Sequence, residues 1–218
     1  MQLFRDRSQA GQELAKALYP YRSWPNPVVL ALPRGGVPVA YEVAKYLHAP
    51  LDIFLVRKLG MPGQEEYAMG AIASGGIRIL DERIVRSIPD SRRVIAGIIK
   101  RETEELERRE KAYRGHCPAL CLQGKTVFLV DDGLATGSTM RAAIAAVRNQ
   151  RPASIVVAVP VAAADTSREL RNEVDAVVCA RTPEPFHAVG CWYENFPQTS
   201  DDEVRDYLKR AEPLREAV

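Results

Sequence analysis

The sequence lacks the features that mark secreted and membrane-spanning proteins. Its four cysteines include no C-x-x-C pair, and a chain of 218 residues can build a core without disulfides, so neither a disulfide framework nor a redox pair is indicated. Its longest apolar run, residues 155–164, is too short to span a bilayer and is interrupted by Pro160. The N-terminus carries charges where a signal peptide needs an apolar core. We therefore expect a cytoplasmic protein that does not enter the membrane.

An excess of charge of one sign is also missing. The chain has 30 basic and 28 acidic residues, which leaves a net charge of +2. A nucleic-acid-binding domain usually carries a clear basic surplus, so we do not expect a nucleic-acid partner. The length fits one α/β domain with an elaboration, and residues 1–218 are expected to form that single domain. The partners we expect are small molecules.

The strongest signal lies at residues 126–140. Residues 126–130 form an apolar run without polar alternation, which is typical of a parallel strand covered on both faces. Asp131 and Asp132 follow at once, and a turn of small and hydroxylic residues then leads into a helix over 141–150. Main-chain N–H groups at such a turn can bind a phosphate, while adjacent acids complement a diol or a hydrated Mg²⁺. The pattern predicts a pocket for a sugar phosphate; the alternative is an ordinary strand, turn and capped helix.

This order of strand, two acids, spacer and T-G-x-T resembles the phosphoribosyl pyrophosphate (PRPP) motif of type I phosphoribosyltransferases. It is not a Walker A loop, because no Lys follows Gly137, and no G-x-G-x-x-G occurs for a dinucleotide. The resemblance implies that Asp131 and Asp132 hold the ribose hydroxyls and could meet Mg²⁺ through water. It also implies a loop around the 5′-phosphate, made of Ala135, Thr136, Gly137, Ser138 and Thr139. The implied fold is a central, mostly parallel sheet flanked by helices.

A second glycine turn follows the strand predicted at residues 28–32. Arg34, Gly35 and Gly36 come directly after it and precede a helix from about Val37. The glycines admit close approach of a ligand and the Arg adds positive charge, which suits a pyrophosphate. In the resembling family this loop holds pyrophosphate, and these three residues are assigned that role. A surface Arg on an ordinary strand-to-helix turn is the alternative.

A charged hinge follows the next predicted strand, residues 51–56. Arg57 and Lys58 open a segment with two glycines and a proline, and this suggests a mobile lid. In the resembling family a lid at this point excludes water from the reaction, and Arg57 and Lys58 would meet the leaving pyrophosphate. Glu65 and Glu66 in the lid could accept a proton from the base. A solvated surface loop is the alternative.

Residues 81–122 are expected to form a helical insertion. Before it, residues 67–74 and 77–80 are predicted as a hairpin. Apolar residues early in the segment 91–113, followed by Glu-to-basic pairs at i,i+4, predict a charged helix that leans on the core with its first half only. Such a helix can be a dimer arm, a cover for a neighbouring site or a solvated face.

The terminal segments complete the pattern. Residues 4–18 predict an amphipathic helix with Ser8 as its N-cap, and residues 182–218 predict a hood followed by a terminal helix over 200–211. The hood segment is rich in aromatics, and Phe186, Trp192 and Tyr193 are candidates for stacking on a planar base. Aromatic packing within the segment is the alternative.

The resemblance implies Mg²⁺-dependent transfer of the phosphoribosyl group from PRPP to a nitrogenous base, with release of pyrophosphate, by an enzyme expected to be a homodimer. In 6-oxopurine members of that family an Asp acts on the purine at the position of Ala135. Alanine cannot exchange a proton, which disfavours hypoxanthine, guanine and xanthine, and A-T-G-x-T is closer to the adenine type. Two rivals stay open: a PRPP- or nucleotide-sensing regulator, and a phosphohydrolase.

Overall fold

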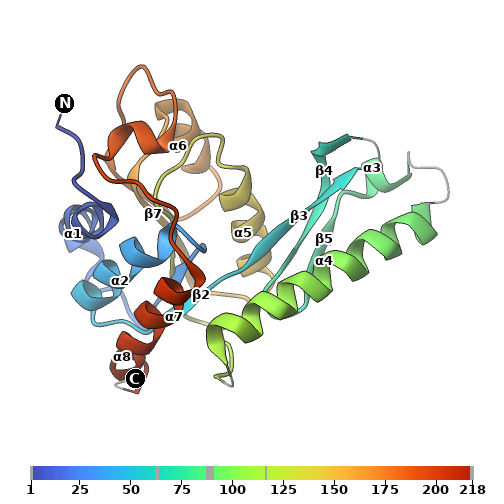
Figure 1. The fold of residues 1–218 in the computed structure, drawn as a ribbon, viewed down its shortest axis with the longest axis horizontal. Helices are drawn as coiled ribbons and strands as arrows, with labels where there is room; N and C mark the ends of the chain where they lie inside the picture. Colours follow the sequence, from blue (N-terminus) through green and yellow to red (C-terminus); the bar gives the residue numbers. More distant parts are fainter. Residues whose placement is uncertain (1, 62–63, 87–90, 116, 217–218) are drawn as a thin grey trace.

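The central body is built on one five-stranded parallel sheet in the order β2–β1–β6–β7–β8 (Figure 1). The computed structural model describes residues 2–61, 64–86, 91–115 and 117–216. The strands of this sheet are β1 (Pro27–Ala31), β2 (Leu51–Ile53), β6 (Thr126–Val130), β7 (Ser154–Val161) and β8 (Ala176–Arg181). The predicted α/β fold with a parallel central sheet is confirmed.

Helices cover both faces of this sheet, so its central strands β1, β6 and β7 are buried over nearly their whole length. The helices of the body are α1 (Arg7–Ala17), η1 (Tyr19–Tyr21), α2 (Gly36–Leu47), α5 (Ser138–Arg148) and α6 (Ala164–Leu170). Successive residues of β6 point to opposite faces. Phe128 joins the core beneath α1 and α2, whereas Leu129 joins the core that includes Ile144 and Val147 of α5.

The first helix begins one residue earlier than its predicted cap. Asp6 is the N-cap of α1, because its side chain accepts a hydrogen bond from the Gln9 main-chain N–H at 2.8 Å. The prediction of Ser8 as N-cap is therefore wrong. Ser8 lies inside the helix, and its hydroxyl is 3.3 Å from that of Tyr207. This register places Arg7 at the first helical position.

An arm formed by residues 56–114 projects away from the body (Figure 1). It contains an antiparallel sheet of three strands, and the predicted hairpin is confirmed within it. Two helices accompany these strands and fall within the predicted insertion. The elements of the arm are β3 (Val56–Met61), β4 (Gln64–Ala73), β5 (Ile77–Leu80), α3 (Glu82–Arg86) and α4 (Ser91–Arg114).

The long helix α4 is anchored to the body through its C-terminal end. Its first half packs on the sheet of the arm through Ile95, and its second half buries Leu106 and Tyr113. The expectation that only the first half is packed is therefore wrong. At its last residue, Arg114 donates to Asp52 at 2.9 Å and to the Ile53 carbonyl oxygen at 2.6 Å. The Arg114 and Asp52 side chains are 8% and 1% exposed, so this is a buried anchor.

The C-terminal part crosses the front of the body as an extended hood segment, residues 182–200, and ends in helices. Its helices are η2 (Val189–Trp192), α7 (Asp201–Arg210) and α8 (Glu212–Glu216). The predicted terminal helix is confirmed as α7, and Ser200 with Glu203 forms its capping box. The hood is joined to the N-terminus, because the Phe4 main-chain N–H donates to the Trp192 carbonyl oxygen at 2.9 Å. Within the described residues, no helix is both long and apolar enough to cross a membrane.

Candidate functional site

The loops that follow β1 and β6 meet at the carboxyl edge of the sheet. A Cβ atom at Gly35 would lie 2.0 Å from an Asp132 carboxylate oxygen, and one at Gly36 would lie 2.7 Å from the Val130 carbonyl oxygen. No side chain fits at either position, so both glycines serve close approach of the two loops. The Pro33–Arg34 peptide bond between the strand and these glycines is cis. The predicted pyrophosphate loop and the acidic pair thus share one rim.

The two acids sit largely out of water at this rim. Asp131 accepts a hydrogen bond from the Asp132 main-chain N–H at 2.8 Å, and Asp132 accepts one from Arg7 Nε at 2.8 Å. Burial raises the pKa of the Asp131 carboxyl well above its usual value, and the neighbouring Asp132 charge raises it further. Burial also raises the pKa of Asp132, although Arg7 opposes this shift. Paired oxygens in this setting can accept hydrogen bonds from a diol.

The turn from β6 to α5 is braced from behind. Gly137 is the N-cap of α5 with φ of 70°, a conformation that favours glycine. Thr166 of α6 donates to the Ala135 carbonyl oxygen at 2.6 Å, and Arg141 donates to that of Thr136 at 2.9 Å. Because two of its carbonyl oxygens are bonded on the protein side, this turn can present main-chain N–H groups to an anion. Ala135, Thr136 and Thr139 are exposed, whereas Ser138 is half-buried.

Sequence reasoning missed the residues that hold this turn. Arg141 also donates to Glu169 at 2.6 Å and to Glu173 at 2.9 Å, so its guanidinium is fixed by carboxylates from the α6 region. Such long-range partners leave no local pattern in the sequence. Arg141 itself lies two residues after the T-G-x-T turn, and this nearness in the chain was the one available signal.

Arg34 turns toward the C-terminal part of the chain. Its Nη1 lies 3.4 Å from Asp201 at the start of α7, and the Tyr113 hydroxyl donates to the same Asp201 oxygen at 2.7 Å. The Tyr113 hydrogen bond holds the pKa of Asp201 below its usual value. Burial, with Asp201 beside it, raises the pKa of Tyr113 to about 12. Arg34, the residue predicted to bind pyrophosphate, is therefore linked through Asp201 to both α7 and the arm.

The structure separates the two cations predicted to act together in the lid. Arg57 Nε donates to Glu102 of α4 at 2.6 Å and is fixed inside the arm. Adjacent strand residues point to opposite faces, and Lys58 lines a cleft of about 900 Å³ that also includes Ser138. Lys58 therefore borders the cleft between the arm and α5, and it also borders a smaller cleft of about 360 Å³ with Arg57 and Glu102. The side chains of Glu65 and Glu66 lie outside the described part of the chain.

The hood aromatics divide into one internal residue and two partly exposed ones. Tyr193 is 5% exposed, and its hydroxyl donates to the Asp132 carbonyl oxygen at 2.6 Å. It therefore supports Asp132, in place of the predicted contact with a base. Phe186 and Trp192 stack with ring centroids 6.5 Å apart, and both are half-buried. Val189, which was missed, lies over Gly133, where a Cβ atom would be 2.5 Å from its side chain.

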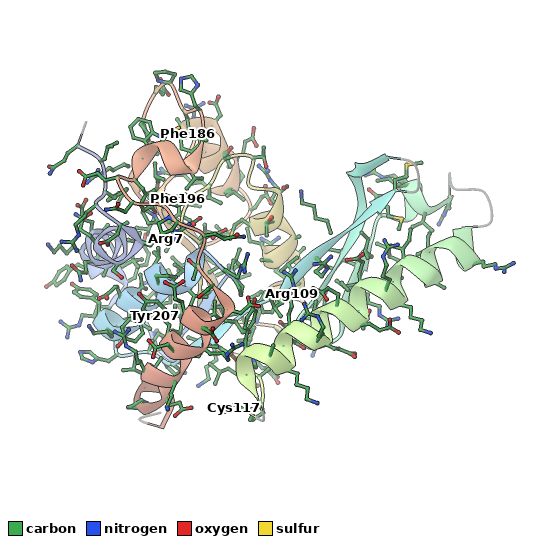
Figure 2. The ribbon with its side chains drawn as sticks, viewed as in Figure 1. Arg7, Arg109, Cys117, Phe186, Phe196 and Tyr207 are labelled. Carbon is green, nitrogen blue, oxygen red and sulfur yellow. The ribbon has the colours of Figure 1, made fainter. Side chains whose placement is uncertain are left out.

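A further missed residue, Arg7, reaches the site from α1. Its guanidinium lies 3.7 Å from the centre of the Phe196 ring, and its Nη1 donates to the Pro197 carbonyl oxygen at 2.6 Å (Figure 2). Together with the bond to Asp132, these contacts leave its side chain 10% exposed. The N-terminal helix and the hood segment therefore meet at the acidic pair.

This combination of strands, loops and acids matches a known family. The family model described as the phosphoribosyl transferase domain matches residues 4–194. The chain belongs to the phosphoribosyl transferase domain family. The membership predicted from the PRPP motif is thereby confirmed.

A curated relative and a solved structure are each similar to nearly the whole chain. "Putative phosphoribosyl transferase Rv0571c" of Mycobacterium tuberculosis is 45% identical over 211 residues, which cover 97% of this chain and 47% of that protein. The chain thus spans about half the length of this curated relative. The crystal structure of TT1426 from Thermus thermophilus is 41% identical, with a TM-score of 0.86. That similarity covers 96% of this chain and 99% of the other, and it includes the arm and the hood.

Proposed function

We propose that the protein transfers the phosphoribosyl group of PRPP to a nitrogenous base, with Mg²⁺, and releases pyrophosphate. The observation that carries this proposal is the shared rim: Gly35 and Gly36 lie against Asp131 and Asp132, next to the turn into α5. A sugar that carries phosphate groups at two positions needs donors on both sides and acceptors for its hydroxyls between them. The rim offers that order.

For this reaction the protein mainly has to position the substrate and offset the negative charge on pyrophosphate. The bond between the ribose anomeric carbon and the pyrophosphate oxygen breaks, and pyrophosphate keeps the electron pair. A base nitrogen forms the new bond to that carbon, and a proton carried by that nitrogen passes to pyrophosphate or to water. Asp131 and Asp132 would orient the ribose, and residues 135–139 would hold the 5′-phosphate. Arg34 and the Gly35–Gly36 turn would offset the growing charge on pyrophosphate. Lys58 would add charge from the arm.

The donor set suits a Mg²⁺ ion that is held mostly by substrate oxygens and water. Among the described residues, no group of three or more His, Cys, Asp or Glu side chains could hold a metal on its own. Asp131 and Asp132 offer carboxylate oxygens, one of which is taken by Arg7. Mg²⁺ commonly keeps several waters and uses one or two carboxylates with substrate phosphates. When bound, it would neutralise negative charge on pyrophosphate.

For the acceptor, we propose a base other than a 6-oxopurine, with an adenine-like base first. Ala135 is exposed at the turn and cannot exchange a proton with a purine nitrogen. Phe186 and Trp192 present partly exposed rings, and Val189 adds an apolar side chain above Gly133. Stacking and apolar contact of this kind favour a planar ring.

A PRPP- or nucleotide-sensing regulator is the second candidate, favoured by one observation. Arg57, expected to act on pyrophosphate, is bound to Glu102 within the arm, so the lid offers the site less charge than the sequence indicated. A sensor needs the binding rim but not the lid. A homodimer and a cytoplasmic location are also part of our proposal.

Pyrophosphate release in the presence of PRPP and Mg²⁺, measured with a panel of purine, pyrimidine and pyridine bases, tests the function. Release that depends on one base would support the transferase and identify its acceptor. PRPP binding by calorimetry without release for any base would favour the sensor. Release of inorganic phosphate without a base would indicate a phosphohydrolase instead.

A further inference from the structure

Arg7 is fixed by contacts that do not depend on a substrate. Its guanidinium stacks on Phe196 and bonds to Pro197, both in the hood segment, and α1 fixes its main chain. One nitrogen, Nε, then meets Asp132 Oδ2 at 2.8 Å. A stacked and hydrogen-bonded guanidinium of this kind loses little further freedom when it pairs with a carboxylate.

We infer that Arg7 is a positioning residue for the ribose, which acts by holding the Asp132 carboxylate in one orientation and offsetting the charge of the acidic pair. The inference rests on the proposed function, because it assigns a role toward the ribose of PRPP. It adds a residue from outside the PRPP motif to the site.

The need for such a residue follows from the crowding at the rim. Two neighbouring carboxylates repel each other where water is largely excluded, and Gly35 lies directly against Asp132. Tyr193 bonds to the main-chain carbonyl oxygen of Asp132, whereas Arg7 bonds to its carboxylate. With Oδ2 bound by Arg7, Oδ1 is left to accept a ribose hydroxyl. Without Arg7, the Asp132 side chain would turn toward water.

Calorimetry with Mg²⁺ and two probes, PRPP and inorganic pyrophosphate, tests this role. Arg7→Ala should weaken PRPP binding by about 10- to 100-fold, a loss of the size found when a partner that orients a metal-binding side chain is removed. It should lower pyrophosphate affinity much less, because that probe has no ribose hydroxyl for the Asp132 carboxylate to accept. Arg5→Ala is the matched control: Arg5 is an exposed cation two residues away, and its replacement should change neither affinity.

Arg7→Lys separates charge from packing. Its ammonium can still pair with Asp132 but cannot stack on Phe196 in the same way, so it should recover part of the lost PRPP affinity. This variant also keeps the test open if Arg7→Ala does not fold. Equal losses of PRPP affinity in Arg7→Lys and Arg7→Ala would overturn the charge pairing.

The outcomes separate this inference from the function on which it rests. Unmodified protein that binds no PRPP would overturn the proposed function, and this inference with it. Unmodified protein that binds PRPP, with the same affinity in Arg7→Ala, would overturn the inference alone. Equal losses for PRPP and pyrophosphate in Arg7→Ala would also overturn it, because they would indicate general damage to the site.

Discussion

Strands β6 and β3 show how differently the body and the arm are built. All five residues of β6 are buried, whereas in β3, whose six residues are all described, Leu59 alone is buried. The body encloses its sheet between helices, and the arm covers one face of a small sheet with the charged helix α4. Ion pairs follow the same division. Arg114 and Asp52 are buried at the foot of the arm, whereas Lys100 and Glu104 on α4 are 79% and 64% exposed.

This difference assigns different tasks to the two regions. A rim that must hold two acids and a phosphate turn within tenths of an ångström needs the close packing of the body. For the proposed reaction, we expect the arm, whose strand β3 buries only Leu59, to move at lower cost and to bring Lys58 toward PRPP. We therefore expect substitutions in the body to affect binding, and substitutions in the arm to affect turnover.

The largest effect should come from the acidic pair. Asp131→Asn with Asp132→Asn removes two charged acceptors for the ribose hydroxyls, each worth about 1.5–3 kcal/mol, so PRPP affinity should fall by about 100-fold or more. Calorimetry with PRPP and Mg²⁺ measures this loss. Unchanged affinity would refute the ribose contacts and remove the main distinction between body and arm.

The anchor at the foot of the arm should give the next largest effect. Arg114→Ala leaves the buried Asp52 carboxylate without its cation and should lower the free energy of unfolding by about 3–5 kcal/mol. Arg108→Ala is the matched control: Arg108 pairs with Glu105 while 65% exposed, so its replacement should change the free energy of unfolding far less. Urea denaturation compares the two. Similar losses in both variants would contradict the contrast between buried and exposed pairs.

A smaller effect should separate Lys58 from Arg57. Lys58 faces the cleft beside Ser138, so Lys58→Ala should lower kcat about 10-fold with little change in PRPP affinity. Arg57 is bound to Glu102, so Arg57→Ala should mainly lower the stability of the arm. Steady-state kinetics and hydrogen exchange of the arm amides distinguish the two. Equal losses of kcat in both variants would indicate that Arg57 also contacts the leaving pyrophosphate.

The smallest effect concerns Tyr113, which links the arm to α7. Tyr113→Phe removes the hydrogen bond to Asp201 and should cost about 1 kcal/mol of unfolding free energy at pH 7. Because the folded pKa of Asp201 is lowered, its contribution is present above its usual value near 4 and is lost as the pH falls through the folded value. The difference between the two proteins should therefore shrink at acidic pH. Urea denaturation of both proteins at pH 7 and pH 3 measures this difference in unfolding free energy. An equal difference at the two pH values would show that the Tyr113 hydrogen bond does not depend on an ionised Asp201.

The parts of the site that could be predicted from the sequence are those formed by neighbouring residues. The strand, acids and turn at 126–140 lie within one stretch, and β1 with its glycines lies within another. The parallel sheet then brings their carboxyl ends together without further information. This is why the two loops meet at one edge of the sheet.

The rest depends on contacts between residues far apart in the chain. Arg7 meets Asp132 across 125 positions, and Arg34 meets Asp201 across 167. The side of the arm to which Arg57 and Lys58 point depends on which face α4 covers, and no local pattern states this. Tyr193 was predicted to stack on a base because it lies in an aromatic segment. The sequence alone does not distinguish a buried aromatic residue in such a segment from an exposed one.

The buried Asp52 has a consequence for how this fold can vary. Its carboxylate bonds to Arg114 at the end of the arm and to the Leu120 main-chain N–H just beyond it, while β2, which carries Asp52, leads into the arm. The segment that enters the arm and the segment that leaves it are therefore bonded to each other through the Asp52 carboxylate. Evolution or design could lengthen, shorten or exchange the segment between these points, provided that the Asp52 carboxylate and its bonds to Arg114 and Leu120 are kept.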